Sequence, residues 1–89
     1  MKPKIEFMAG YYEYLLYVND ELIYAWGGDI RDDWYESYEP DIEAENMIYC
    51  AIEDIKESDK SLVKVNIIEE NKPAIQEIIK NYIKRELLI

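Results

Sequence analysis

The feature that most constrains the fold is a pair of alternating aromatic and β-branched runs separated by only two residues. Residues 11–18 and 21–26 alternate as β-strands do, and Asn19-Asp20 stands between them. Both turn residues tolerate a positive φ, so the pattern predicts a tight β-hairpin. The expected shared faces are Tyr12, Tyr14, Leu16 and Val18 on the first strand, and Leu22, Tyr24 and Trp26 on the second.

The flanking segments predict a further strand and a short helix. Residues 4–8 alternate Ile5 and Phe7 with charged or flexible neighbours, which indicates a strand before the hairpin. Gly27-Gly28 ends the last strand of the hairpin, and Asp29 is a candidate helix N-cap. The residues that recur every fourth position in this expected helix, which Pro40 ends, are Ile30, Trp34 and Tyr38.

The remaining chain predicts two longer helices with one strand between them. Residues 41–57 carry an apolar stripe, residues 62–68 alternate as a strand does, and Asn71 and Pro73 begin a final amphipathic helix. The order β-β-β-α-α-β-α predicts a single small α/β domain of the α+β type, spanning residues 1–89. It would have one mostly antiparallel four-stranded sheet with helices packed on one face. The expected stripe of residues 41–57 is Ile42, Met47, Ile48, Ala51, Ile52 and Ile55, and that of the final helix is Ile75, Ile78, Ile79, Tyr82, Ile83 and Leu87.

Negative charge is concentrated in the first part of the chain. The net charge is −10, and residues 5–55 hold 14 acidic residues and one basic residue, Arg31. Such a surface repels phosphate groups, so direct binding of nucleic acid or of an anionic membrane is not expected. A basic protein surface would be attracted instead. The lone cysteine excludes an internal disulfide, and no apolar run is long enough to span a bilayer, so we expect a cytoplasmic protein.

The sequence lacks the residues of the common catalytic centres. It has no histidine, which excludes Ser–His and Cys–His pairs and imidazole-bearing zinc sites. No phosphate-binding glycine motif is present, so no cofactor is expected. Cys50 stands between Tyr49 and Ala51 on the second helix, where we expect a packed and inert thiol. We therefore expect a binding protein rather than an enzyme.

The densest acidic and aromatic segment is the candidate partner-binding site. Its acids recur at helical spacing and can cap and solvate a short helix, hold a divalent cation, or face a basic partner. Their spacing does not match a calcium-binding loop, and no metal site is expected. Tyrosine and tryptophan dominate binding hot spots, and they interleave with these acids. The candidate residues are Asp29, Asp32, Asp33, Trp34, Tyr35, Glu36, Tyr38, Glu39, Asp41, Glu43 and Glu45.

In composition and charge layout, residues 29–45 and the tyrosine-rich hairpin resemble the small acidic anti-defence proteins of phages and mobile elements. These include anti-CRISPR and anti-restriction proteins that mimic nucleic acid. The resemblance is one of type and not of motif, and it implies an inhibitor without cofactor that occupies a basic, nucleic-acid-binding surface of an effector. Three alternatives remain open. The chain could be an immunity protein or antitoxin against a basic toxin, a self-associating module that forms a homodimer, or a small metal-dependent enzyme.

Overall fold

The three amino-terminal strands form an antiparallel sheet around the predicted hairpin. In the computed structural model, which describes residues 2–27 and 39–87, they are β1 (Ile5–Gly10), β2 (Glu13–Val18) and β3 (Glu21–Gly27), in the order β1-β2-β3. Asn19 and Asp20 have φ angles of 52° and 66°, so the predicted two-residue turn is confirmed. The side chain of Asn19 accepts a hydrogen bond from the backbone N–H of Lys4, which ties the turn to the start of the sheet.

A second tight turn, Tyr11-Tyr12, joins β1 to β2. Gly10 pairs with Glu13, so only two residues remain to reverse the chain, and Tyr12 has a φ of 61°. The prediction that a strand begins at Tyr11 is therefore wrong for its first two residues. Tyr11 is 85% exposed and Tyr12 is 69% exposed, and their rings meet edge to face at 4.4 Å between centroids.

A β-bulge in β3 changes which of its residues face the core. Leu16 pairs with Tyr24 and Tyr17 pairs with Leu22, so Ile23 is an additional residue on β3. An added residue reverses the alternation of faces beyond it. The expected common face of Leu22, Tyr24 and Trp26 is therefore wrong for Leu22, which is 42% exposed, while Ile23 is buried.

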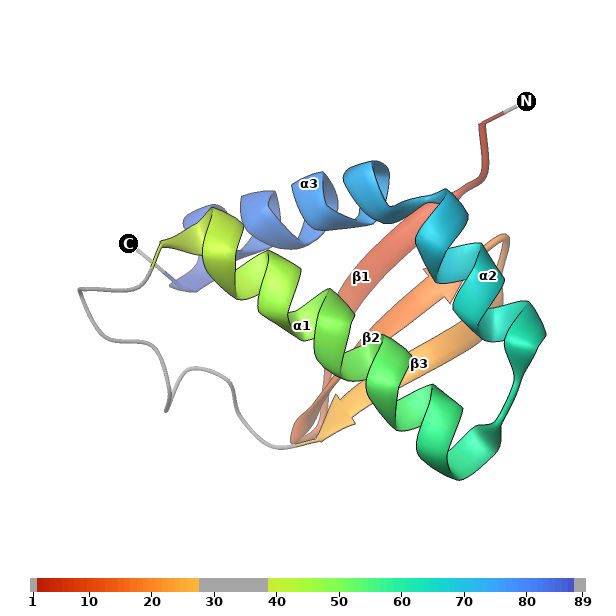
Figure 1. The fold of residues 1–89 in the computed structure, drawn as a ribbon. Helices are drawn as coiled ribbons and strands as arrows, with labels where there is room; N and C mark the ends of the chain where they lie inside the picture. The colour runs from red at the N-terminus through yellow and green to blue at the C-terminus, as the bar shows by residue number, and fades with distance from the viewer. Residues whose placement is uncertain (1, 28–38, 88–89) are drawn as a thin grey trace.

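The helices follow the sheet in the order α1, α2 and α3 within the described residues (Figure 1). Helix α1 (Pro40–Asp54) continues into the π-helical turn η2 (Ile55–Asp59), close to the predicted helix at 41–57. Helix α3 (Lys72–Tyr82) continues into η3 (Ile83–Leu87) and confirms the final amphipathic helix. The Asn71 side chain does not cap α3, because it donates its hydrogen bond back to the carbonyl of Ile67.

The predicted fourth strand is wrong, because residues 62–68 belong to the helix α2 (Leu62–Glu70). Within the described residues the sheet has three strands and not four. Strand alternation would have buried Val63 together with Val65, but Val63 is exposed and the buried pair is Val65 and Ile68. Tertiary packing of this helical pair overrides the strand preference of β-branched residues. Ser61 supplies the start signal, because its hydroxyl accepts a hydrogen bond from the backbone N–H of Lys64 at 3.3 Å.

Replacing Ser61 with alanine is expected to lower the free energy of unfolding by about 1 kcal/mol, because it removes the N-cap of α2. Urea denaturation followed by circular dichroism measures the change. The control Ser61→Asp keeps a capping oxygen and should cost only a few tenths of a kcal/mol. Equal stability of Ser61→Ala and the unmodified chain would contradict a capped helix at this position.

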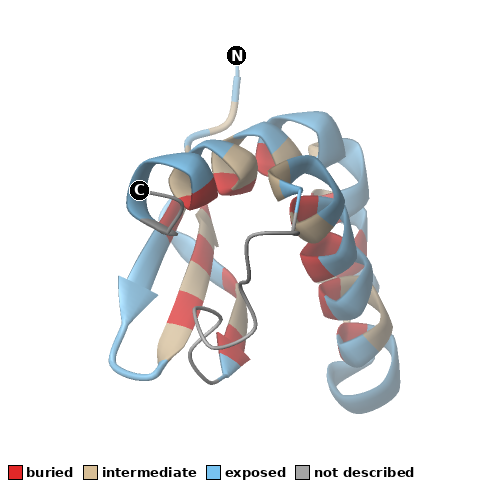
Figure 2. Ribbon diagram, turned by 90° about the vertical axis from the view of Figure 1, so that its left-hand side faces the viewer, coloured by how far each residue is buried: buried red, intermediate tan, exposed pale blue. Residues whose placement is uncertain are grey.

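The helices cover one face of the sheet, and the core lies between the two layers (Figures 1 and 2). Stacked and edge-on aromatic rings fill one part of it, where Phe7 contacts Tyr14, Trp26 and Tyr82. Strand register places Met8, Leu15 and Ala25 in one row on the opposite face. The buried apolar residues are Phe7, Tyr14, Leu16, Val18, Ile23, Trp26, Ala44, Met47, Ile48, Ala51, Ile55, Val65, Ile68, Ile75, Ile79 and Ile83.

Candidate functional site

A buried hydrogen bond fixes the orientation of α1 on the sheet. The indole Nε1–H of Trp26 donates to the backbone carbonyl of Met47 at 2.9 Å. Small and apolar side chains at Ala44, Ile48 and Ala51 complete the inward side of the helix. The opposite side of α1 must therefore face outward.

This outward side, which we name the α1 acidic face, combines carboxylates with an aromatic ring. Glu45, Tyr49 and Glu53 follow one another at four-residue spacing, so the two carboxylates stand about 12 Å apart along the helix. Tyr49 is 64% exposed. Ile42 is 55% exposed, so its expected place in the buried stripe is wrong, because it lies on the outward side at the start of the helix. The face consists of Ile42, Glu45, Asn46, Tyr49, Cys50 and Glu53.

The charge of α1 is entirely negative. The helix contains five acidic residues and no basic residue. Asp41 in its first turn is paired with Lys80 of α3 at 3.2 Å, and this hydrogen bond is the main cause of the raised pKa of Lys80, with Glu77 contributing second. Within the described part of the chain, no cation lies within ion-pair distance of Glu45 or Glu53. The outward row therefore presents uncompensated carboxylates.

The structure places four of the predicted site residues. Glu39 is exposed just before α1, Asp41 is exposed but paired with Lys80, Glu43 is half-buried, and Glu45 is exposed on the α1 acidic face. The structure therefore places Glu45 in one row with Tyr49 and Glu53, and it directs Asp41 toward α3. The predicted short helix and seven of its candidate site residues lie outside the described residues, namely Asp29, Asp32, Asp33, Trp34, Tyr35, Glu36 and Tyr38.

The sequence interpretation missed two features of the surface. Tyr49 and Glu53 continue the row of Glu45 at intervals of four, and that spacing is the signal that could have found them. The exposed Tyr11-Tyr12 turn carried no comparable signal, because tyrosine is rarely found at a positive φ. Exposed tyrosines offer a large contact area at low entropic cost, so both features suit protein binding.

Cys50 is exposed on the α1 acidic face, so the expectation of a packed thiol is wrong. Residues 47, 48 and 51 take the inward positions of that helical turn, which leaves position 50 facing outward. We expect a maleimide reagent to modify Cys50 stoichiometrically in the native protein, as measured by intact mass. The matched control is the urea-unfolded chain. Modification that occurs only after unfolding would contradict the placement of this face.

The hydroxyl of Tyr24 joins β3 to the end of α1. It donates a hydrogen bond to Oδ2 of Asp54 at 2.6 Å, and Ser58 Oγ donates to the backbone carbonyl of Asp54 at 2.7 Å. Burial first, and then the hydrogen bond to Asp54, raise the pKa of Tyr24 well above its ordinary value of 10.0. The contact therefore holds the phenol in its protonated form.

Tyr24 gives the free energy of unfolding a dependence on alkaline pH. Above its ordinary pKa of 10.0 the unfolded chain releases the phenol proton while the folded chain keeps it. The contribution of Tyr24 to stability should be complete below pH 10.0 and should decline as the pH rises above that value. Urea denaturation at several alkaline pH values measures the decline. In Tyr24→Phe the loss of stability should be shallower, and an identical slope would contradict the assignment.

No known protein family, curated protein or solved structure matches this chain. In residues 2–27 and 39–87, no three histidine, cysteine, aspartate or glutamate side chains are grouped so that they could hold a metal ion. None of the described helices has the length and apolar character needed to cross a membrane.

Proposed function

We propose that this chain is a small acidic binding protein that inhibits a nucleic-acid-binding effector by occupying its basic surface. The observation that carries the proposal is the α1 acidic face, where Glu45 and Glu53 flank the exposed ring of Tyr49 and have no cationic partner in the described part of the chain. Carboxylates along a helix can take the place of phosphates, and an aromatic ring can take the place of a base. The net charge of −10 supports rapid encounter with a basic partner.

The candidate residues at positions 29–38 belong to the same proposal. They precede α1 directly in the chain, and Asp32, Asp33 and Glu36 would add to its negative charge. An anti-defence role, of the anti-CRISPR or anti-restriction kind, is the particular form that we propose. The cytoplasm, where such effectors act, is the proposed location.

A competition experiment tests this function. The tagged chain is used to recover partners from a host lysate, the partners are identified by mass spectrometry, and the binding of a purified partner to nucleic acid is then measured. We expect a basic effector that loses its nucleic acid as the chain is added. Nucleic acid that stays bound in a ternary complex would overturn the proposal.

Two other outcomes separate the proposed function from its alternatives. Recovery of one small basic toxin enzyme would identify an immunity protein or antitoxin instead, provided that the chain neutralises this enzyme in an activity assay. A mass in solution that rises with protein concentration, without any basic partner, would indicate a self-associating module.

A further inference from the structure

Strand β3 forms an open edge of the sheet. It pairs with β2 alone, and no hydrogen bond within the described residues engages the backbone groups on its other side. An edge strand presents a row of N–H and C=O groups that another extended chain can pair with. The middle of this edge, Leu22 to Ala25, is the part that borders a pocket.

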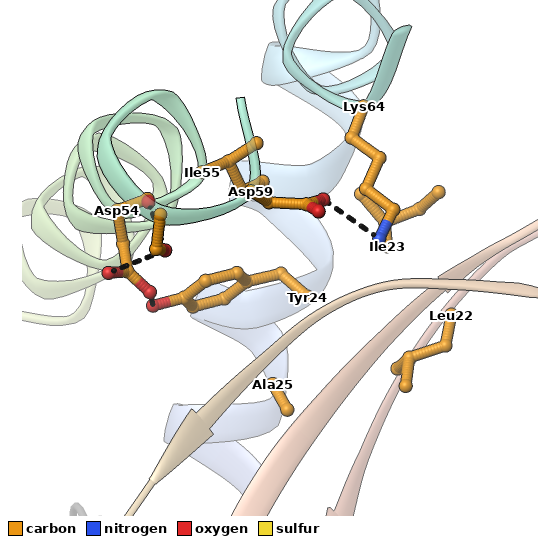
Figure 3. Close-up of a pocket in the computed structure, with 9 residues that line it drawn as sticks. Leu22, Ile23, Tyr24, Ala25, Asp54, Ile55, Asp59 and Lys64 are labelled. Atoms are coloured by element: carbon orange, nitrogen blue, oxygen red, sulfur yellow. Dashed lines mark hydrogen bonds and ion pairs between the residues drawn. The ribbon is translucent and has the colours of Figure 1, made fainter. Parts of the chain in front are cut away.

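The pocket lies between β3 and the carboxyl end of α1, with a volume of about 250 Å³ (Figure 3). Its apolar part includes the buried side chains of Ile23 and Ile55. Its polar part includes the carboxylates of Asp54 and Asp59. The full lining is Leu22, Ile23, Tyr24, Ala25, Asp54, Ile55, Ser58, Asp59 and Lys64.

The two carboxylates of the pocket differ in their partners. Asp59 forms an ion pair with Lys64 at 3.2 Å. Within the described residues, the carboxylate of Asp54 accepts hydrogen bonds from the hydroxyl groups of Tyr24 at 2.6 Å and Ser58 at 3.5 Å, and both of these donors are neutral. Asp54 is therefore the one carboxylate of the pocket that no described cation neutralises.

We propose that the free edge of β3 binds an extended segment of the basic partner and that this pocket receives an arginine side chain of the segment. Backbone groups of the segment would pair with β3 as a fourth strand. The aliphatic stem of the arginine would pack on Ile23 and Ile55, and its guanidinium would reach Asp54 beside the ring of Tyr24. This inference rests on the proposed function, because it names how the basic partner is recognised.

Charge favours a basic segment over a second copy of this chain. Pairing β3 with its own copy would bring two strongly acidic domains together, and β3 carries an acid, Glu21, but no cation for Asp54. Arginine fits better than lysine, because its planar fork can meet a carboxylate with two hydrogen bonds.

The test uses a synthetic seven-residue peptide that alternates threonine and valine around a central arginine. Its control replaces the arginine with the neutral isostere citrulline. Titration into the ¹⁵N-labelled chain should shift the backbone amide signals of residues 22–25, and the citrulline peptide should bind about three- to five-fold more weakly. Asp54→Asn should lose the preference for arginine, while Glu69→Gln, an exposed acid on α2, should keep it.

Three results would overturn this inference. They are amide shifts that lie away from β3, equal affinity for the two peptides, and self-pairing of β3 detected as a concentration-dependent mass. The outcome is separable from that of the proposed function. If the chain displaces nucleic acid from its effector but does not bind the peptide, only the binding site proposed at the edge of β3 is refuted. If the chain prefers the arginine peptide but inhibits no effector, only the proposed function is refuted.

Discussion

Replacing Glu45 and Glu53 with lysine is expected to weaken binding of the basic partner by about 100-fold or more. Each reversal changes an attraction of about 1 kcal/mol in water into a repulsion of similar size, so two reversals amount to several kcal/mol. On the outward side of α1, Glu45 is exposed and Glu53 is half-buried, and neither belongs to the buried core, so the domain should stay folded. Calorimetry at fixed ionic strength measures the affinity, and circular dichroism checks the fold.

The matched control reverses two exposed acids elsewhere, Glu69 and Glu70 at the end of α2, and changes the net charge equally. This control should lower affinity by less than about ten-fold, through long-range attraction that salt screens. If it weakens binding as much as the α1 variant, net charge decides affinity and the α1 acidic face is not the site. The triple reversal of Asp32, Asp33 and Glu36 should also abolish binding. Unchanged affinity there would remove residues 29–38 from the site.

Replacing Ile48 with alanine is expected to lower the free energy of unfolding by about 3 kcal/mol. Ile48 is only 1% exposed and packs in the core between α1 and the sheet. Removing a buried isoleucine side chain to its β-carbon costs about 2–5 kcal/mol through lost burial and the remaining cavity. Urea denaturation followed by tryptophan fluorescence measures this change. In a domain of this size the loss is a large part of the total stability.

Ile42→Ala is the control for the core variant, because it makes the same chemical change on the same helix. Ile42 is 55% exposed, so its loss of burial should be small and partly offset by the better helix propensity of alanine. We expect a change within about 0.5 kcal/mol. Equal costs for the two variants would contradict the observed orientation of α1.

The parts of the fold that the sequence predicts correctly are those that local chemistry determines. Asn19 and Asp20 accept positive φ angles. They are the only residues between the two alternating runs, so the chain must reverse in a two-residue turn. The 3.6-residue pattern of Ile75, Ile79 and Ile83 can be buried only as a helix. These signals need no knowledge of the rest of the chain.

The errors arose where packing at a distance decides the outcome. Residues 62–68 satisfy strand alternation, but Val65 and Ile68 bury together only on a helix, and Ser61 caps it. The bulge at Ile23 depends on how β3 registers against β2, which periodicity within one strand cannot show. The bulge therefore places Leu22 at the surface instead of in the core.

The candidate site was predicted in part for a similar reason. Counting acids located the negative charge of α1, including Glu45, but it could not show that Asp41 is neutralised by Lys80 from α3. The outward direction of Tyr49 and Cys50 follows from the docking of α1 through Trp26, which is a tertiary contact. Charge composition thus identifies the region, and packing decides which of its residues are available.

The order of the strands has a consequence for how the domain assembles. Because β1, β2 and β3 are neighbours both in the chain and in the sheet, each pairing closes only a two-residue turn. Short loop closures cost little entropy and favour fast formation. We therefore expect the three-stranded sheet to form early, and α1 and α3 to pack on it afterwards. The three strands lie within the first 27 residues, so they can pair before the acidic helix α1 packs on them.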